Sequence, residues 1–183
     1  MDKNVNINRS SIKLTIRRVI MYSLISLFIL FLLFVVLPQI GFYAYIFDRG
    51  EYKYSESTTE IISDIDELTP RTRGLAIEFL KRCEESGLSV RITETYRSQA
   101  RQDILYEQGR ITPGQIITWT KNSKHTSRRA FDICEDNTDD PYGDIEFFRK
   151  CAEIGKDVGL TPGYYFKGNQ DMPHYEFNSW WLP

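Results

Sequence analysis

Both histidines of the chain lie within a few residues of a carboxylate, an arrangement that suits metal binding and acid–base chemistry. His125 and Asp132 belong to the stretch S-K-H-T-S-R-R-A-F-D-I, which passes from a polar loop into an apolar strand. His174 stands in D-M-P-H-Y-E, where Asp171 precedes it and Glu176 follows it. These five side chains are the first candidates for chemistry.

Such side chains suit a catalytic zinc site, in which three protein ligands leave the fourth position to water. Zinc makes bound water more acidic and polarises a carbonyl oxygen. Peptide hydrolysis also needs a carboxylate that is not a ligand, to take the proton of the water and pass it to the leaving amine. Asp171 or Glu176 can supply that carboxylate. The spacing permits this site without requiring it, because single histidines are commonly surface or core residues.

Short helices and strands must position these residues. Capping residues and a helical repeat of apolar side chains predict three helices, bounded by Thr69 and Gly87, by Ser98 and Gly109, and by Asp144 and Gly159. Alternating apolar residues predict four strands, at 89–95, 116–119, 130–134 and 174–177. The order lacks a regular strand–helix–strand rhythm. It therefore favours an α+β fold, with a small antiparallel sheet and flanking helices.

An uncharged apolar segment runs from Val19 to Leu37, and about 20 such residues cross a bilayer core as a helix. Basic residues precede it, and an aromatic cluster at 42–47 suits the far membrane interface. The sequence predicts a single-pass anchor in the cytoplasmic membrane, with a cytoplasmic basic tail over 1–18, a transmembrane anchor over 19–47 and the remainder outside. A cleaved signal peptide is the alternative, but its apolar region spans about 7–15 residues and ends at a small-residue site.

Residues 48–68 are polar and acidic at first, and we expect a tether that leads into a short helix or the edge of a domain over 69–183. The net charge is −2, and basic residues are concentrated before residue 19, which excludes a globally basic nucleic-acid binder. The three cysteines show no CxxC spacing, so a cysteine zinc site is not expected. They are predicted to be buried, with one disulfide bridge left open as an alternative.

Three motifs resemble those of the D-Ala-D-Ala carboxypeptidase-like (VanY-like) zinc peptidases, in particular their L-alanyl-D-glutamate endopeptidase branch. T-Y-R-S-Q-A-R-Q-D-I-L-Y-E-Q-G-R-I-T-P-G (95–114) is similar to the family's Y-R-S-x-x-R-Q-x-x-L-Y-x-Q-G-R-T-x-x-G. The stretch 123–133 is similar to its S-x-H-x-x-G-x-A-x-D, and 171–176 to its D-x-P-H-F-E. The three motifs follow the family order and cover roughly residues 60–180.

The resemblance implies that His125, Asp132 and His174 bind Zn²⁺ and that Asp171 is the general base. It also implies that Arg97 faces the substrate, where a guanidinium can bind a carboxylate or stabilise a developing oxyanion. The alternative for Arg97 is an ion pair at the strand–helix corner.

Ser123 is expected to touch the substrate or to orient the His125 loop. Arg101, Gln102 and Tyr106 are expected to pack the helix and to support the residues that do chemistry.

The implied function is hydrolysis of an amide bond in the peptidoglycan stem peptide by a membrane-anchored zinc peptidase, with no nucleic acid and no obligate protein partner. L-Ala–D-Glu is the first expectation for the cleaved bond. D-Ala-D-Ala carboxypeptidase action is the second, and a non-catalytic cell-wall-binding module is a further alternative.

The chain departs from the family pattern at Arg128, which replaces a glycine between the first histidine and the aspartate. Glycine there indicates a positive φ or a close approach of the backbone, and arginine is costly in either case. The segment before the last motif is also altered, to G-Y-Y-F-K-G-N-Q (163–170), whose aromatic residues line the cleft or pack. Trp180 and Trp181 are predicted to close the edge of the core, with glycan stacking or a membrane interface as alternatives.

Overall fold

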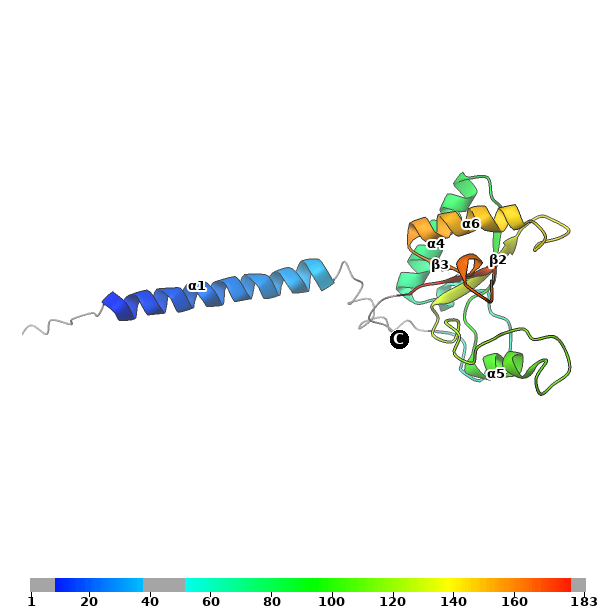
Figure 1. Cartoon of the computed structure of the whole chain (residues 1–183), viewed down its shortest axis with the longest axis horizontal. Coiled ribbons are helices and arrows are strands. Elements are labelled where there is room, and N and C mark those ends of the chain that lie inside the picture. The colour runs from blue at the N-terminus through cyan, green and yellow to red at the C-terminus, as the bar shows by residue number, and fades with distance from the viewer. Residues whose placement is uncertain (1–8, 38–51, 179–183) are drawn as a thin grey trace, which may run out of the picture. The chain divides into compact units, whose positions relative to one another are not determined.

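The computed structural model describes residues 9–37 and 52–178 (Figure 1). Its contacts divide the chain into two compact units, Met1–Asp48 and Arg49–Pro183, each of which is described by itself.

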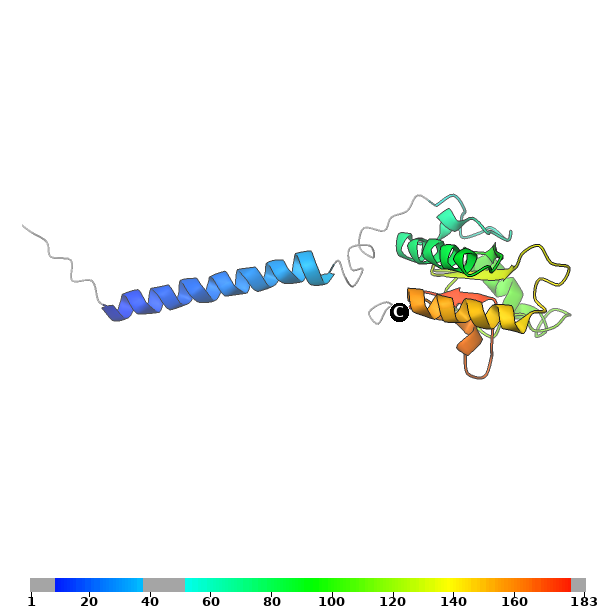
Figure 2. The same cartoon turned by 90° about the horizontal axis from the view of Figure 1, so that it is seen from above.

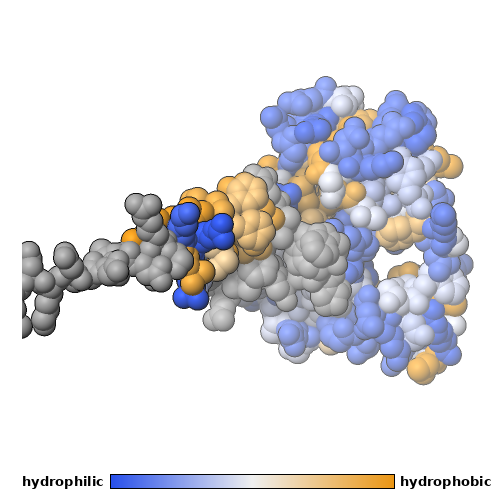
Figure 3. Space-filling view, turned by 60° about the vertical axis from the view of Figure 1, so that its left-hand side comes forward, coloured by the Kyte–Doolittle hydropathy of each residue, from blue (hydrophilic) through white to orange (hydrophobic). Residues whose placement is uncertain are grey.

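The described residues of the first unit form a single long helix. The α-helix α1 (Arg9–Phe31) continues into a π-helical turn, η1 (Leu32–Val36). The stretch Ile12–Val36 has a mean hydropathy of 2.9 and is long and apolar enough to cross a membrane. At 1.5 Å per residue it is about 37 Å long, against about 30 Å for a bilayer core. Its apolar side chains appear as the orange surface beside the uncertain grey segments in Figure 3.

The helix differs in extent from the predicted anchor. It begins at Arg9, inside the stretch predicted to be a tail, so Lys13, Arg17 and Arg18 are helical. A helix continues through basic residues because their straight side chains lose little rotamer freedom in it. The aromatic cluster at 42–47, like Trp180 and Trp181, lies outside the described residues.

The second unit is an α+β fold, as the sequence predicted. Its sheet has the strand order β1-β2-β4-β3, and every neighbouring pair is antiparallel. The strands are β1 (Val90–Glu94), β2 (Ala130–Glu135), β3 (Thr161–Pro162) and β4 (His174–Glu176). Helices α4 (Pro70–Glu85) and α6 (Ile145–Val158) lie on one side of the sheet, and α5 (Gln99–Glu107) lies on the other (Figures 1 and 2).

The predicted capping residues begin these helices. The side chains of Thr69, Ser98 and Asp144 accept hydrogen bonds from backbone N–H groups in the first turns of α4, α5 and α6. Gly159 closes α6 with a φ of 97°, a left-handed conformation that glycine adopts without steric cost.

The core lies between the sheet and the helices α4 and α6. Phe131 and Ile133 of β2 and Tyr175 of β4 are fully buried there, and the Tyr175 ring lies 4.7 Å from that of Phe79 on α4. Burial of each such side chain stabilises the fold by about 1.5–3 kcal/mol. Since side chains alternate along a strand, Asp132 and His174 must face the opposite side of the sheet. All three cysteines are buried and free, as predicted.

The structure corrects the strand predicted at 116–119. These residues form no strand, and Ile117 and Trp119 are exposed. A strand needs a partner edge, and the loop after α5 runs beside none of the four strands of the sheet. The short strand β3 was not predicted, because two residues carry no periodicity.

The stretch predicted as a tether that leads into a short helix or the domain edge is described from residue 52 onward. Its described part, residues 52–68, belongs to the second unit and includes a 3₁₀ turn, η2 (Ile65–Glu67). Leu68 and Ile62 are buried, and the backbone N–H of Thr95 donates to the carbonyl of Ile62 at 2.6 Å. These apolar residues hold the segment at the edge of the domain.

Candidate metal site

The register of the sheet places three polar residues side by side. Glu94 of β1 lies opposite Asp132 of β2, and Asp132 lies opposite His174 of β4. Directly opposed residues in antiparallel strands point to the same face, here the face away from α4 and α6. A register irregularity between Ile92 and Glu94 accompanies this arrangement. Strand pairing alone thus brings together two of the three predicted ligands.

His125 comes from the turn that precedes β2. The N–H of Arg129 donates to the carbonyl of Lys124, and that of Arg128 to the carbonyl of His125, each at 3.0 Å. This pair of bonds is a Schellman motif with Arg128 at its left-handed position, where φ is 59°. The positive φ indicated by the family glycine is therefore present, and it costs an arginine about 1–2 kcal/mol.

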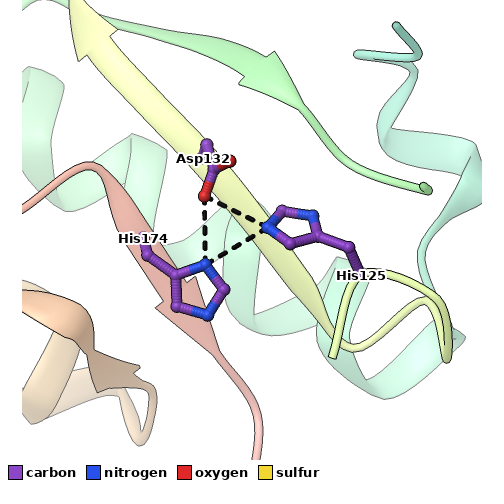
Figure 4. Close-up of side chains that lie close together, drawn as sticks. All are labelled: His125, Asp132 and His174. Carbon is purple, nitrogen blue, oxygen red and sulfur yellow. Dashed lines mark hydrogen bonds and ion pairs between the residues drawn. The ribbon is translucent and has the colours of Figure 1, made fainter. Parts of the chain in front are cut away.

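The three predicted ligand atoms form a compact triangle (Figure 4). His125 Nε2 and His174 Nδ1 each lie 3.1 Å from Asp132 Oδ1, and 3.2 Å from one another. A tetrahedral zinc ion with bonds of about 2.0–2.2 Å has donor atoms about 3.3–3.6 Å apart. The triangle is therefore slightly tighter than one face of such a tetrahedron, and the donor set fits a zinc ion.

Hydrogen bonds at the far side of each ring leave the inward nitrogen free. His125 Nδ1 lies 2.7 Å from the carbonyl oxygen of Thr95, which can only accept, so Nδ1 carries the proton. His174 Nε2 lies 3.2 Å from the carboxylate of Glu176 and donates to it. The lone pairs of His125 Nε2 and His174 Nδ1 then point into the triangle once the rings are neutral. Partners of this kind orient the histidines of metal sites.

The electrostatics of the triangle favour a negative charge on Asp132 and a positive charge on His174. Burial disfavours the charged form of Asp132, but His125 and His174 outweigh it and hold the pKa of Asp132 well below its usual range. Burial likewise opposes charge on His174, while hydrogen bonds to Asp132 and Glu176 raise the pKa of His174 to about 10. A cation is thus stabilised within the triangle even without metal.

The triangle opens into a cleft of about 650 Å³, which Arg97, Ser123 and Asp171 also line. Asp171 is exposed to this cleft. Partial desolvation and repulsion from Asp132 raise the pKa of Asp171 above its usual range. Its backbone N–H donates to the carbonyl of Gly163 at 3.0 Å, which fixes the turn that leads to His174. All the predicted site residues therefore meet at one cleft.

Arg97 is buried and already engaged. Its guanidinium donates to the Glu94 carboxylate, to Gln102 Oε1 at 2.9 Å and to Asp132 Oδ2 at 3.5 Å. It combines both roles expected from the sequence, since it makes the corner ion pair and also lines the cleft. Its Nε is buried without a hydrogen-bond partner among the described residues.

Ser123 accepts a hydrogen bond from the N–H of His125 at 3.3 Å, so it orients that loop. Gln102 is fully buried and bonds to the 118–120 loop as well as to Arg97, in the supporting role expected for it.

Sequence reasoning missed four residues of this site. Glu94 binds both Arg97 and Arg101, and Thr95 supplies the carbonyl that orients His125. Lys124 and Trp119 line the cleft. Among the described residues, Lys124 has no carboxylate partner within 4.0 Å, in contrast to the two arginines of the cleft. Its position beside His125 is the one sequence signal that pointed to it.

The three aromatic residues before the last motif, Tyr164 to Phe166, differ in their surroundings. Phe166 lines the cleft, and its ring lies 5.9 Å from that of His174. Tyr164 packs against the core, and Tyr165 is exposed. Only one of the three thus shapes the space where a substrate would lie.

Comparison with known proteins gives two informative matches. The chain is 33% identical over 102 residues to the peptidoglycan L-alanyl-D-glutamate endopeptidase CwlK of Bacillus subtilis, covering 49% of this chain. The L-Ala D-Glu endopeptidase ChiX of Serratia marcescens has the same fold, with a TM-score of 0.51 at 17% identity, over 71% of this chain and 92% of ChiX. The chain is therefore similar to CwlK in sequence and to ChiX in fold. The match to CwlK spans 61% of the length of CwlK. No family model matches the chain.

Proposed function

We propose that the chain is a membrane-anchored zinc peptidase that hydrolyses an amide bond of the peptidoglycan stem peptide. The observation that carries this proposal is the triangle of His125 Nε2, Asp132 Oδ1 and His174 Nδ1 at the floor of an open cleft. Three protein donors with room for a water are the arrangement of a catalytic zinc site. When bound, the ion would acidify that water and polarise the carbonyl of the substrate.

Asp171 acts as the general base in this proposal. It lines the same cleft as the ligands, and its raised pKa suits a carboxylate that takes a proton from water and passes it to the leaving amine. Glu176, the other candidate, already accepts from His174 Nε2 on the far side of the ring. The two carboxylates near His174 therefore have separate tasks.

Two cations of the cleft serve the substrate. Arg97 contributes positive charge beside Asp132, where negative charge would develop on the attacked carbonyl, and it also holds Asp132 in place. Lys124 is half-buried in the cleft wall and has no close carboxylate partner among the described residues. It is the cation available to a carboxylate of the substrate.

L-Ala–D-Glu is the bond we propose, because the names of CwlK and ChiX both give that specificity. D-Ala-D-Ala carboxypeptidase action would use the same residues, and the products distinguish the two. Cleavage before D-Glu splits the stem peptide in two, whereas the carboxypeptidase releases a single alanine.

The test is digestion of purified muropeptides by the full chain in detergent, with and without a zinc chelator, followed by mass analysis. We expect two peptide fragments, their loss with the chelator, and their return when zinc is restored. Zinc-loaded protein that binds muropeptides without releasing any product would instead identify a non-catalytic wall-binding module.

Asp171→Asn separates catalysis from metal binding. The variant should keep its zinc, because Asp171 is not in the ligand triangle, while turnover falls by about 10²–10⁴-fold through loss of the base. Zinc content and initial rates measure the two effects. Asp139→Asn, at an exposed aspartate, is the matched control and should change neither. Full activity in Asp171→Asn would show that another group is the base.

The proposed location is the cytoplasmic membrane, with the N-terminus inside and the peptidase unit outside. The apolar stretch Ile12–Val36 and the basic residues at its start support this orientation. An anchor would also hold the enzyme within reach of the cell wall.

A further inference from the structure

The side chain of Arg128 lies outside the cleft and reaches the segment that precedes the peptidase fold. Its Nη1 donates to the Glu67 carboxylate and, at 3.1 Å, to the Glu67 carbonyl oxygen. Its Nη2 donates to the carbonyl oxygen of Tyr54 at 3.1 Å. We call residues 52–68, which carry these acceptors, the strap. The guanidinium therefore binds both ends of the strap.

Aromatic rings enclose the same guanidinium. Its central carbon lies 3.9 Å from the centre of the Tyr52 ring and 3.6 Å from that of Tyr96. Tyr52 belongs to the strap, whereas Tyr96 is buried in the domain beside Thr95. The Arg128 side chain is 12% exposed and that of Glu67 is 3% exposed. A buried carboxylate needs such a partner, so the pair is a fixed clamp rather than a surface contact.

The strap contacts both structures that hold His125. Arg128 closes the turn that contains His125, and its carbonyl accepts from the N–H of Thr69 at the end of the strap. On the other side, Thr95 Oγ1 donates to the carbonyls of Ile62 and Asp64, at 3.0 and 2.8 Å. The carbonyl of Thr95 in turn accepts from His125 Nδ1. Strap, turn and ligand form one connected network.

We infer that the strap is a working part of the metal site and that Arg128 is a positioning residue, which clamps the strap and thereby fixes His125 for zinc. The inference rests on the proposed zinc function. It explains why an arginine occupies a left-handed position where glycine has no steric cost. The steric cost of this backbone conformation is offset by the contacts of the Arg128 side chain, which glycine cannot make.

The test measures zinc affinity and hydrogen exchange of the full chain in detergent, in Arg128→Gly and Glu67→Gln variants. Arg128→Gly relieves the backbone and removes the clamp, whereas Glu67→Gln weakens the clamp and leaves the backbone of Arg128 as it is. Asn137→Gly is the matched control, since Asn137 also has a positive φ, of 60°, but lies exposed in another loop.

We expect both clamp variants to bind zinc at least tenfold more weakly in competition with a chromophoric chelator. The amides of the strap and of Thr95, which donates to Ile62, should exchange faster, and Asn137→Gly should match the wild type in both measurements. The inference would be overturned if the strap amides of the clamp variants exchanged faster while their zinc affinity stayed within threefold of wild type. Unchanged exchange of these amides would also overturn it. If Arg128→Gly does not fold, Glu67→Gln decides by the same criteria.

The same measurements distinguish failure of the clamp from failure of the proposed zinc function. A wild-type chain that binds no zinc would refute the zinc peptidase. The exchange of Thr95 and of the 123–129 turn would then decide whether the clamp positions His125.

Discussion

At the scale of single residues, the site depends on atoms that never touch the metal position. The carbonyl of Thr95 and the carboxylate of Glu176 each hold the outer nitrogen of a histidine ring. Each thereby determines which ring nitrogen has a free lone pair. The hydrogen bond to the Glu176 carboxylate is the stronger of the two, because its acceptor is charged. It therefore makes His174 a more basic metal ligand than the neutral carbonyl makes His125.

Replacement of Glu176 by glutamine tests this difference. Glu176→Gln keeps an oxygen that can accept from His174 Nε2 but removes its charge, so zinc should bind about 10–100-fold more weakly. Competition with a chromophoric chelator measures the affinity. Glu85→Gln, at an exposed glutamate of α4, should leave it unchanged. Equal affinities in the two variants would mean that the backbone alone orients His174.

The affinity of the site for zinc should depend on pH. The pKa of His174 is raised to about 10 in the metal-free site, so its ring is protonated at neutral pH and must lose a proton when zinc binds. The zinc dissociation constant should therefore fall about tenfold for each pH unit between pH 6 and 8. Titrations in buffers that do not bind zinc measure this slope, and a flat profile would contradict it.

The same shift affects the stability of the metal-free fold. A group whose pKa is raised by folding stabilises the fold fully below its unfolded value, here about 6.5. That contribution is lost as the pH rises through about 10. Metal-free protein should thus lose this part of its stability in alkaline buffer.

At the scale of elements, the site is positioned by strand register and by two turns. Asp132 and His174 are partners in the β2–β4 pair, and a slip of β4 by one residue would turn His174 towards the core and away from Asp132. The turn before β4 depends on Gly163, because a Cβ there would lie 2.3 Å from the carbonyl oxygen of Asp171 and 3.0 Å from His174 Cβ.

Gly163→Ala should therefore displace the turn that carries Asp171 and His174. We expect a melting temperature several degrees lower, from a cost of about 1–3 kcal/mol, together with a larger fall in kcat than rise in KM. Thermal unfolding and steady-state rates measure these effects. Gly74→Ala in α4 is the control, since a Cβ there meets nothing within 4 Å, and it should stabilise the helix by about 0.5–1 kcal/mol. A Gly163→Ala melting curve equal to that of wild type would show that the turn gives way freely.

At the scale of the whole molecule, the apolar helix is predicted to remain as a membrane anchor. An uncleaved anchor predicts that the full-length protein sediments with membranes, resists alkaline carbonate extraction and keeps the mass of the intact chain. Removal of residues 1–37 should release it into the soluble fraction. A mature protein that begins after the apolar stretch would identify a cleaved signal peptide instead. Protease digestion of spheroplasts tests whether the peptidase unit lies outside.

The sequence by itself determined the features that depend on neighbouring residues. Thr69, Ser98 and Asp144 cap helices with their own side chains, and the apolar run before Leu37 forms a helix, because these effects act within a few positions. The ordered motifs also predicted the ligand set, although spacing alone left the metal site undecided.

Only the tertiary structure decided the features that join distant segments. The triangle of candidate ligand atoms, the separate positions of Asp171 and Glu176, and the contacts of Glu94 and Thr95 depend on strand register and turn closure. The sequence predicted a tether that leads into a short helix or the domain edge, but it did not indicate that Arg128, far along the chain, binds residues 52–68 to the domain. No local pattern encodes such a contact, because its energy arises only when the fold brings a guanidinium, a buried carboxylate and two aromatic rings together.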